Sequence, residues 1–406
     1  RVSVNLLMDL SIIAEAFVVV VIGGMGSIPG AFIAALLIGE LNAFGVLVLP
    51  QATIVLAFVV MAVVLVIRPY GLLGKAETLA HSAGQVELPI RPASTLAKSV
   101  AGLLLAGLVV MPLLAGEFAI VLATDVLIFA LFAASLHFIM SNGGMVSFGH
   151  AAYFGLGAYG AAFVIKYAGG SMELALLAAP LMAAAGALVF GWFCVRLSGV
   201  YMAMLTLAAA QIVWSTAFQW QDLTGGDDGL LGIWPSEWAK SKTAYYYLAL
   251  VLCGGGILAR RRMIFSPFGY TLRGGRDNPN RTESIGINLR HHQWAAFIVA
   301  GMFAGIAGGV YVFSKGSIFP DEAAIPRSVD ALVMVLLGGV QTLSGPVVGA
   351  GVFRLLEDEI SRLDYWRAIL GAIIIAIVVI APEGIAGFIK KIAVKAGFER
   401  NEEQAS

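Results

Sequence analysis

Long apolar runs without a charged side chain constrain this chain of 406 residues more than any other feature. A bilayer core takes about 20 apolar residues per helix. The runs that meet or approach this length without Asp, Glu, Lys, Arg or His are Leu41–Ile67, Ser99–Gly116, Leu174–Val195, Leu197–Gln221 and Gln293–Phe313. Shorter or interrupted runs lie near residues 10–24, 28–40, 118–141, 145–165, 245–259, 329–343, 345–356 and 366–381. We predict an all-α polytopic membrane protein with about 12 transmembrane or re-entrant helices, some of them broken, and no spanning strands.

The composition excludes a water-soluble protein. Hydrophobic residues make up 59% of the chain and charged residues 12%, about half the soluble average. The net charge is zero, so the basic footprint of a nucleic-acid-binding protein is missing. Cys194 and Cys253 lie in apolar runs and the five histidines lack metal-site spacing, so we expect no disulfide scaffold, metal or other cofactor. The start at Arg1, without a signal-peptide pattern, is interpreted as a truncation or a fragment.

Lys and Arg gather in a few segments, and such residues mark the cytoplasmic side of a membrane protein. The segments that hold most of them are residues 68–98, Arg196, residues 260–290 and the tail from Lys390. We place these segments in the cytoplasm. Residues 220–245 and the loops near Lys315 and Asp364 then lie on the opposite face.

An internal repeat links the two ends of the chain. Residues 14–35 match residues 329–350 at a constant offset, and VIRPYGLLG (66–74) echoes VIAPEGIAG (379–387) with a two-residue slip. The matched pairs are Glu15/Asp330, Ala16/Ala331, Val18/Val333, Val20/Val335, Gly23/Gly338, Gly24/Gly339, Gly30/Gly345 and Ala35/Ala350. The alternative explanation of the matches is a chance similarity between two Gly-rich helix pairs.

We interpret the repeat as two homologous membrane units fused head to tail, the first without its front part. Residues 1–75 form the end of the first unit, and the polar residues 76–98 form a cytoplasmic linker. Residues 99–390 form the second unit, and residues 391–406 form a cytoplasmic tail.

The Gly-Gly pairs of the repeat, Gly23-Gly24 and Gly338-Gly339, are each followed by a Pro-Gly or Gly-Pro step. Such a sequence continues a helix poorly, and broken helices at membrane depth are tolerated where they are buried in protein or line a cavity. The Gly-Gly pairs therefore have two interpretations: they allow two helices to pack closely, or they line the wall of a substrate pathway.

A second glycine-rich stretch runs from Asn142 to Tyr159 and contains His150. Gly149 and Tyr153 would share one helical face with Gly157. A histidine at membrane depth is costly unless it is paired or wetted. It is either a pathway residue or a histidine that donates to a neighbouring carbonyl.

No sequence pattern supports catalysis. Residues 224–229 (TGGDDG) fit an ordinary polar turn, and no nucleophile with an adjacent base is visible. The glycine-rich stretches lack the Gly-Lys-Ser/Thr ending of a phosphate loop. We therefore expect no ATP hydrolysis by this chain.

Residues 265–288 (FSPFGYTLRGGRDNPNRTESIGIN) follow three arginines and lie between apolar runs. Arg273, Arg276 and Asn280 have helical spacing, so one face of a helix there would be polar. The segment is either a solvated basic loop or a short cytoplasmic helix that docks into another protein.

With these motifs the sequence resembles the integral membrane permeases of branched-chain amino-acid-type ABC importers. Residues 1–75 resemble the C-terminal part of one permease subunit, through IGGMGSIPG and IRPYGLLGK. Residues from about 99 to 390 resemble a nearly complete partner subunit, through SNGGMVSFGHAAYFGLGAY, VRLSGVYMAMLTLA, TGGDDGL, SPFGYTLRGGRDN, ESIGIN and LLGGVQTLSGPVVGA.

The resemblance implies a type II-like importer fold in a bacterial inner membrane. It places the ATPase-coupling segment at Ser266, Pro267, Gly269, Arg273, Arg276, Asp277, Asn278 and Gly286. The residues that we assign to the substrate pathway are Gly23, Gly24, Gly143, Gly144, Ser147, Gly149, His150, Tyr153, Thr206, Gly338 and Gly339. Gly274-Gly275 and Pro279 depart from the family pattern, so the coupling helix is expected to be short or kinked.

The expected function is the permease component of an ATP-driven importer for a small polar solute, a branched-chain or other amino acid. The implied partners are two cytoplasmic ABC ATPase subunits, an extracytoplasmic solute-binding protein and a further permease subunit. Alternatives within the family are urea, amides or aromatic acids as solutes. An ion-coupled secondary transporter is a second alternative, although its repeats are usually inverted, and a membrane-embedded enzyme is a third.

Overall fold

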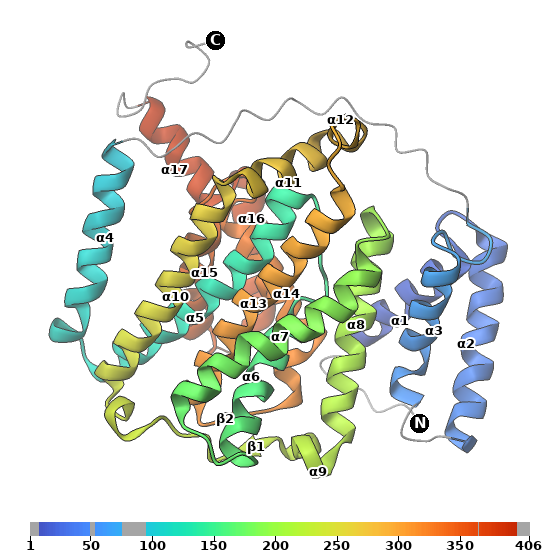
Figure 1. Cartoon of the computed structure of the whole chain (residues 1–406), viewed down its shortest axis with the longest axis horizontal. Coiled ribbons are helices and arrows are strands. Elements are labelled where there is room, and N and C mark those ends of the chain that lie inside the picture. The colour runs from blue at the N-terminus through green and yellow to red at the C-terminus, as the bar shows by residue number, and fades with distance from the viewer. Residues whose placement is uncertain (1–7, 49–52, 75–94, 364, 396–406) are drawn as a thin grey trace.

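The computed structural model describes residues 8–48, 53–74, 95–363 and 365–395, almost entirely as α-helices (Figure 1). The longer helices are α1 (Met8–Gly23), α2 (Ile28–Val48), α3 (Thr53–Ile67), α4 (Thr95–Leu114), α5 (Glu117–His137), α6 (Ala151–Lys166), α7 (Met172–Cys194), α8 (Gly199–Gln219), α10 (Lys242–Ile264), α13 (Leu289–Lys315), α14 (Ile325–Gly338), α15 (Gly345–Ile360) and α16 (Trp366–Ile380). The shorter elements are a π-turn (Phe138–Asn142), α9 (Gln221–Thr224), α11 (Pro267–Asp277), α12 (Pro279–Ser284), α17 (Gly384–Lys395), 3₁₀ turns at Gly226–Asp228, Glu237–Ala239 and Pro320–Ala323, and strands β1 (Leu230–Leu231) and β2 (Ser317–Ile318).

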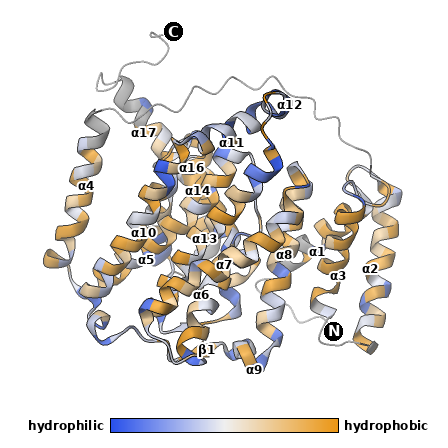
Figure 2. Ribbon diagram, in the orientation of Figure 1, coloured by the Kyte–Doolittle hydropathy of each residue, from blue (hydrophilic) through white to orange (hydrophobic). Residues whose placement is uncertain are grey.

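The all-α polytopic fold predicted from the sequence is confirmed. Within the described residues, seven helices are long and apolar enough to cross a membrane, and three more are apolar but shorter. Figure 2 shows hydrophobic residues along the lengths of these helices. Strands β1 and β2 pair antiparallel through two residues each, which is far too short to span a membrane.

One predicted span is wrong. The apolar run Leu41–Ile67 is divided between α2, which ends at Val48, and α3, which begins at Thr53. Pro50 lies between the two helices in sequence, and proline removes a helical hydrogen bond and clashes with the preceding turn. Hydropathy alone misses such an interruption.

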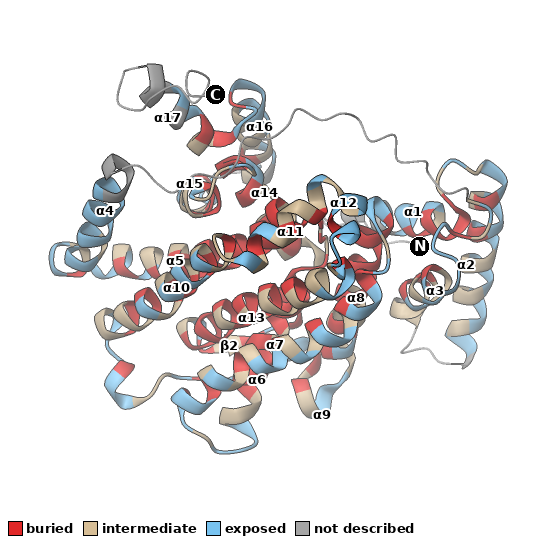
Figure 3. Ribbon diagram, turned by 45° about the horizontal axis from the view of Figure 1, so that its top comes forward, coloured by how far each residue is buried: buried red, intermediate tan, exposed pale blue. Residues whose placement is uncertain are grey.

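Small residues hold the centre of the fold together. Ala175, Ala179, Ala183 and Ala187 recur every fourth residue along α7 and are completely buried. A Cβ atom added at Gly301 of α13 would stand 2.6 Å from the Cβ of Ala187. Close approach of this kind is typical of membrane helix packing. Figure 3 shows buried residues gathered on the central helices, α13 among them, whereas α4 and α2 are largely exposed.

The segments that the sequence analysis assigned to opposite faces of the membrane lie at opposite ends of the molecule. Figure 1 shows α11, α12 and α17 at one end, and α9, β1 and β2 at the other. Because α11 and α12 carry the arginine-rich segment, their end is cytoplasmic by the positive-inside rule. Most of the linker and of the tail, residues 75–94 and 396–406, lies outside the described residues; residues 95–98 form the first turn of α4.

The sequence repeat corresponds to a repeat of structure. Gly23 and Gly338, the equivalent residues of the pair, end α1 and α14. In both places a short break follows, and a second helix, α2 or α15, begins. A Cβ at Gly23 would overlap Gly30, and a Cβ at Gly338 would overlap Gly345, which is the residue equivalent to Gly30. Both copies therefore depend on the same backbone-to-backbone contact.

Candidate translocation and coupling site

The buried glycine-rich stretch between α5 and α6 is not helical. After the π-turn, the chain runs without regular structure from Gly144 to His150, and α6 begins at Ala151. A π-turn of this kind often marks a functional site. The N-terminus of α6 therefore lies inside the protein with the positive end of its helix dipole. Its first three amides are paired: Ala151 donates to the hydroxyl of Ser328 on α14 at 2.9 Å, and the next two amides donate to the carbonyls of Gly149 and His150.

Polar atoms of the break lack partners. The hydroxyl of Ser135 on α5 donates to the carbonyl of Phe132 at 2.6 Å, so its oxygen accepts from Nε2 of His150 at 2.8 Å. The imidazole then carries its proton on Nε2 and leaves Nδ1 as an acceptor. Nδ1 of His150 and Oγ of Ser147 are both buried without a hydrogen-bond partner among the described residues. His150 therefore binds a hydroxyl rather than the carbonyl considered from the sequence.

Thr206 of α8 fixes the middle of the break. Its hydroxyl accepts from the amide of Phe148 at 3.0 Å and donates to the carbonyl of Ala203 at 2.6 Å. A Cβ at Gly149 would overlap the carbonyl oxygen of Thr206. The structure thus brings together Gly149, Thr206, Ser147 and His150, as the pathway assignment predicted.

Tyr153 also contacts His150, with 5.8 Å between the two ring centroids, whereas the glycines of the first repeat lie elsewhere. Tyr153 packs its ring edge-on against Phe297 of α13, with 5.5 Å between ring centroids. Gly149 precedes the helix and contacts α8, so the helical face predicted to be shared by Gly149 and Tyr153 does not form. Gly23 and Gly24 belong to the N-terminal helices, which pack against α8 and contribute an edge-on pair of Tyr70 and Tyr201 at 5.9 Å.

The break between α14 and α15 is a second irregular segment. Gly339 has φ +111°, a conformation that favours glycine. Gly384, which follows α16, has φ +78° and sits so close that its Cβ would overlap Gly339. In the first repeat Gly71, also with φ +78°, approaches Gly24 in the same way. Each break is therefore closed by the chain where it returns after the next two helices.

The predicted coupling segment folds as two short helices. Ser266 precedes α11, and Pro267 occupies its first turn, where a missing amide costs nothing. A Cβ at Gly269 would overlap the carbonyl oxygens of Ile264 and Met263, so α11 turns sharply against the end of α10. The prediction of a short or kinked coupling helix is confirmed.

The kink lies at Asn278, not at the glycine pair. Asn278 is extended, with φ −152° and ψ 94°, and its side chain caps α12 by accepting from the amide of Arg281 at 2.9 Å. Because α11 ends at Asp277, the polar face predicted from Arg273, Arg276 and Asn280 does not continue on one helix. Gly286 follows α12 with φ +87° and is exposed.

Arg276 connects α11 to the break after α5. Its guanidinium donates to the carbonyl of Ser141 in the π-turn and to Asp277 at 3.0 and 2.9 Å. Its side chain covers Gly144, where a Cβ would come within 2.7 Å of Cγ of Arg276. Leu272 of α11 is completely buried and faces Gly143. The cytoplasmic helix and the α5–α6 break therefore form one packed unit.

Sequence reasoning missed a second connection, made by Arg260 and His137. Arg260 on α10 is 2% exposed and donates to the carbonyl of Ala134 at 3.2 Å and to that of Leu343 at 2.7 Å. It also donates to Nδ1 of His137 at 3.0 Å, while Nε2 of His137 donates to the carbonyl of Val340 at 2.7 Å. Val340 and Leu343 belong to the α14–α15 break, so this buried pair holds that break against α5 and α10.

A cluster of ion pairs occupies the opposite half of the protein. Asp125 of α5, only 6% exposed, binds Lys315 of α13 at 2.7 Å and Arg354 of α15 at 3.1 Å. Nearby, Arg327 forms a bidentate pair with Glu322 at 2.7 and 2.8 Å. Asp125 is therefore paired with two basic side chains inside the protein.

The remaining polar loop is a turn. Thr224 donates to the carbonyl of Ala217, and Gly225, Gly226 and Gly229 all have positive φ. No group of three His, Cys, Asp or Glu side chains that could hold a metal occurs among the described residues.

Membrane-crossing helices, broken segments inside the protein and a docked cytoplasmic helix define a polytopic permease. A family model described as "Branched-chain amino acid transport system / permease component" matches residues 118–378. The chain belongs to this family. It is therefore a multi-pass inner-membrane permease of the ABC-importer type, a class that works with ATPase and solute-binding partners.

Individual relatives agree with this placement. The chain is 25% identical to the high-affinity branched-chain amino acid transport system permease protein LivM of Escherichia coli (strain K12), over 306 residues that cover 68% of this chain and 72% of that protein. It is 27% identical to the probable branched-chain amino acid transport permease protein LivH of Methanocaldococcus jannaschii over 135 residues, 30% of this chain and 41% of that protein. It is 47% identical to the permease protein BraD of Pseudomonas aeruginosa over 64 residues, 16% of this chain and 21% of that protein. No solved structure matches the chain.

Proposed function

We propose that this permease carries branched-chain or other amino acids inward, driven by ATP hydrolysis on separate cytoplasmic subunits. An extracytoplasmic solute-binding protein would deliver the solute. The observation that carries the proposal is the contact of Arg276 with Ser141 and Gly144, because it joins an exposed cytoplasmic helix to a broken membrane segment.

The coupling mechanism starts at α11 and α12. ATPase subunits that close on ATP displace the surface formed by Ser266–Gly286. Arg276 transmits that displacement to the end of α5, and Arg260 transmits it through α10 to the α14–α15 break. Both breaks would then shift together and change which side of the membrane reaches the pathway. Coupling of this kind requires two states that are biased from both sites.

The pathway chemistry supports an amino acid. The positive dipole end of α6 favours a carboxylate nearby, and Ser147 and His150 offer buried polar atoms without partners among the described residues. Phe132 stacks on His150 with 5.8 Å between ring centroids and supplies an apolar wall for a branched side chain. Relatives of this chain are named for branched-chain amino acid transport. Urea, amides and aromatic acids, as other solutes of the same pathway, remain the alternative.

The domain organisation supports a fusion of two permease units. Residues 1–75 would be the end of one unit, residues 99–390 a second unit, and residues 76–98 their cytoplasmic linker, with a cytoplasmic tail at 391–406. The glycine contacts shared by the two breaks support this division. A further permease subunit would complete the first half of the pathway.

The test is ATPase coupling in a reconstituted transporter that contains the ATPase subunits and the binding protein. Arg276→Ala, alone and combined with Gly269→Ala, should reduce substrate-stimulated ATP hydrolysis several-fold while membrane insertion persists. The matched control is Arg290→Ala, because Arg290 is an exposed arginine in the first turn of α13, at the same end of the protein as α11. Unchanged coupling in Arg276→Ala would contradict the proposal.

A second arm addresses the secondary-transporter alternative. Vesicles that contain this polypeptide without ATPase subunits should accumulate no solute when an ion gradient is imposed. Accumulation under these conditions would replace the proposed ATP-driven mechanism by an ion-coupled one.

A further inference from the structure

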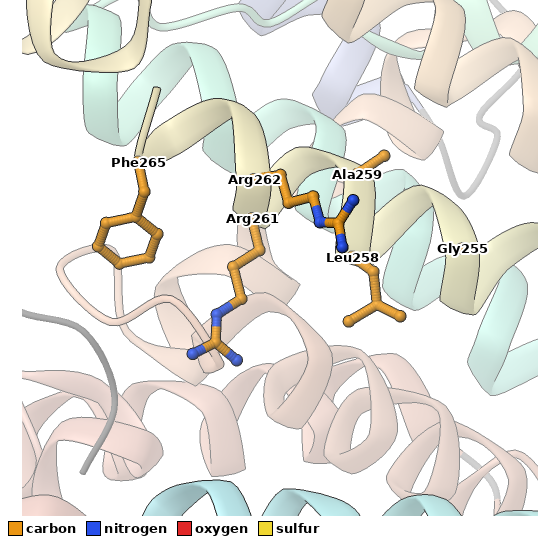
Figure 4. Close-up of a pocket in the computed structure, with 6 residues that line it drawn as sticks. All are labelled: Gly255, Leu258, Ala259, Arg261, Arg262 and Phe265. Atoms are coloured by element: carbon orange, nitrogen blue, oxygen red, sulfur yellow. The ribbon is translucent and has the colours of Figure 1, made fainter. Parts of the chain in front are cut away.

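Three consecutive arginines end α10, and they face different environments. Arg260 points into the protein and is 2% exposed. Arg261 and Arg262 point out of it and line a groove with Gly255, Leu258, Ala259 and Phe265 (Figure 4). Neither Arg261 nor Arg262 forms an ion pair within the described part of the chain. The groove therefore contains two positive charges and no carboxylate among its lining residues.

The groove is open and its wall is apolar. It measures about 630 Å³. Leu258 is 59% exposed, and Val251, two turns earlier on α10, is 69% exposed. A Cβ added at Gly255 would have no atom within 4 Å, so the missing side chain leaves space along the helix surface. This surface is hydrophobic and faces away from the helical core, as a surface in contact with lipid does.

The level of the arginines in the membrane follows from helix geometry. α10 begins at Lys242 on the extracytoplasmic side, and Arg262 lies twenty residues further along. At about 1.5 Å per residue, this distance is about 30 Å, the thickness of the hydrocarbon core. The guanidinium groups of Arg261 and Arg262 therefore lie at the level of the cytoplasmic headgroups, directly beyond the apolar wall.

We propose that this groove binds an anionic phospholipid of the cytoplasmic leaflet. Arg261 and Arg262 would hold its phosphate, because guanidinium groups pair with phosphate in bidentate geometry. One acyl chain would lie along Gly255, Leu258 and Val251. Basic pockets between membrane helices on the cytoplasmic side are suited to anionic headgroups. A soluble anion would use the charges but would leave the apolar wall uncovered.

The site adjoins the coupling machinery. Arg261 and Arg262 follow Arg260 directly, and Phe265 immediately precedes Ser266 and α11. A bound lipid would therefore hold the end of α10 against the headgroup layer, next to the point where α11 turns. This inference concerns lipid binding and does not require the proposed solute.

The experiment measures lipid binding by native mass spectrometry on the purified transporter in mild detergent. Phosphatidylglycerol and phosphatidylethanolamine with identical acyl chains are compared. Two basic side chains near an anionic surface, at about 5-fold each, predict a roughly 30-fold preference for phosphatidylglycerol. Arg261→Gln with Arg262→Gln should abolish this preference, and each single substitution should lower it by about 5-fold. The matched control, Arg290→Gln, removes an exposed charge from the same face and should leave the preference intact.

A second pair of variants tests the acyl-chain part of the groove. Gly255→Leu fills the open space and should weaken both lipids while their ratio persists. Gly254→Leu is the control, because Gly254 also has no atom near its Cβ position but does not line the groove. Gel filtration confirms that each variant is folded.

Three results would overturn the proposal. The first is an unchanged lipid preference in the double glutamine variant. The second is an equal loss in Arg290→Gln, which would indicate nonspecific charge. The third is stabilisation by inorganic phosphate alone that the double variant abolishes, which would identify a soluble phosphate as the ligand.

Discussion

The buried Arg260 gives the sharpest stability prediction. Arg260→Met keeps a long side chain at nearly the same volume but removes every hydrogen-bond donor. The acceptors left without their partner are the carbonyls of Ala134 and Leu343 and Nδ1 of His137. Because these atoms are buried or partly buried, the substitution should loosen the α14–α15 break specifically.

The magnitude follows from the contacts. Each buried acceptor left unsatisfied costs about 1–3 kcal/mol, so two of them sum to roughly 2–6 kcal/mol. Removing a charge from a low-dielectric interior recovers several kcal/mol. The net local destabilisation is therefore about 2 kcal/mol, which corresponds to an opening about 30-fold as frequent.

Cysteine alkylation measures that opening at the break itself. The native Cys194 and Cys253 are buried and unpaired in disulfides, so their background reaction is low. Val340→Cys places a partly buried reporter of similar size in the break. In the Arg260→Met background the reporter should react with maleimide at least ten-fold faster, if reaction follows local opening. Arg260→Lys, which keeps one charged donor group, should give an intermediate rate.

The control is Arg290→Met, which removes an exposed arginine from the same face and should leave the rate of Val340→Cys unchanged. Equal alkylation rates in the Arg260→Met and parent backgrounds would refute the role given to Arg260. A lowered melting temperature without faster labelling would show that the loss is global and not centred on the break.

The remaining predictions concern packing and charge. Gly338→Ala should destabilise the fold by at least about 2 kcal/mol, because its Cβ would overlap Gly345; Gly371→Ala, with nothing near its Cβ position, serves as the control in detergent thermal unfolding. Asp125→Asn should cost about 3 kcal/mol, because Lys315 and Arg354 lose their shared carboxylate. Adding Lys315→Met should restore part of that loss, and a double variant less stable than Asp125→Asn would contradict the ion-pair account.

Much of the architecture was predictable, because lipid imposes a simple rule on the sequence. The uncharged apolar runs predicted the positions of most of the helices. The distribution of arginines predicted that the segment of α11 lies at the cytoplasmic end. The broken segment before α15 was visible as a glycine pair followed by Gly-Pro. These three features are local in sequence, so none of them requires knowledge of which helices pack together.

The network around Arg260 was not predicted because three consecutive arginines look alike in sequence. Only helix phase separates them. Tyr246, Ala249, Cys253 and Gly256 form a buried stripe at helical spacing, and Arg260 is its next member. Extending that stripe by one turn would have placed Arg260 inside the protein. Its acceptors are backbone carbonyls, however, and these carry no sequence signal.

The grouping of site residues was only partly predictable for the same reason. Gly149 and Tyr153 have helical spacing, but the helix begins at Ala151. Gly149 therefore lies outside the helix, and the two residues do not share one helical face as predicted. Ser147, His150 and Thr206 do come together, although Thr206 lies on a distant helix. The pairing of Asp125 with Lys315 and Arg354 likewise depends on tertiary packing across α5, α13 and α15.

The two glycine-closed breaks place their demands on main-chain atoms. A joint of this kind fixes the positions of a few glycines and, at the α14–α15 break, the two side chains that donate to its carbonyls, Arg260 and His137. Divergent permeases can therefore conserve the hinge while rebuilding the lining around it. Distant members should be sought by the spacing of these glycines, since overall identity would fade well before the joint does.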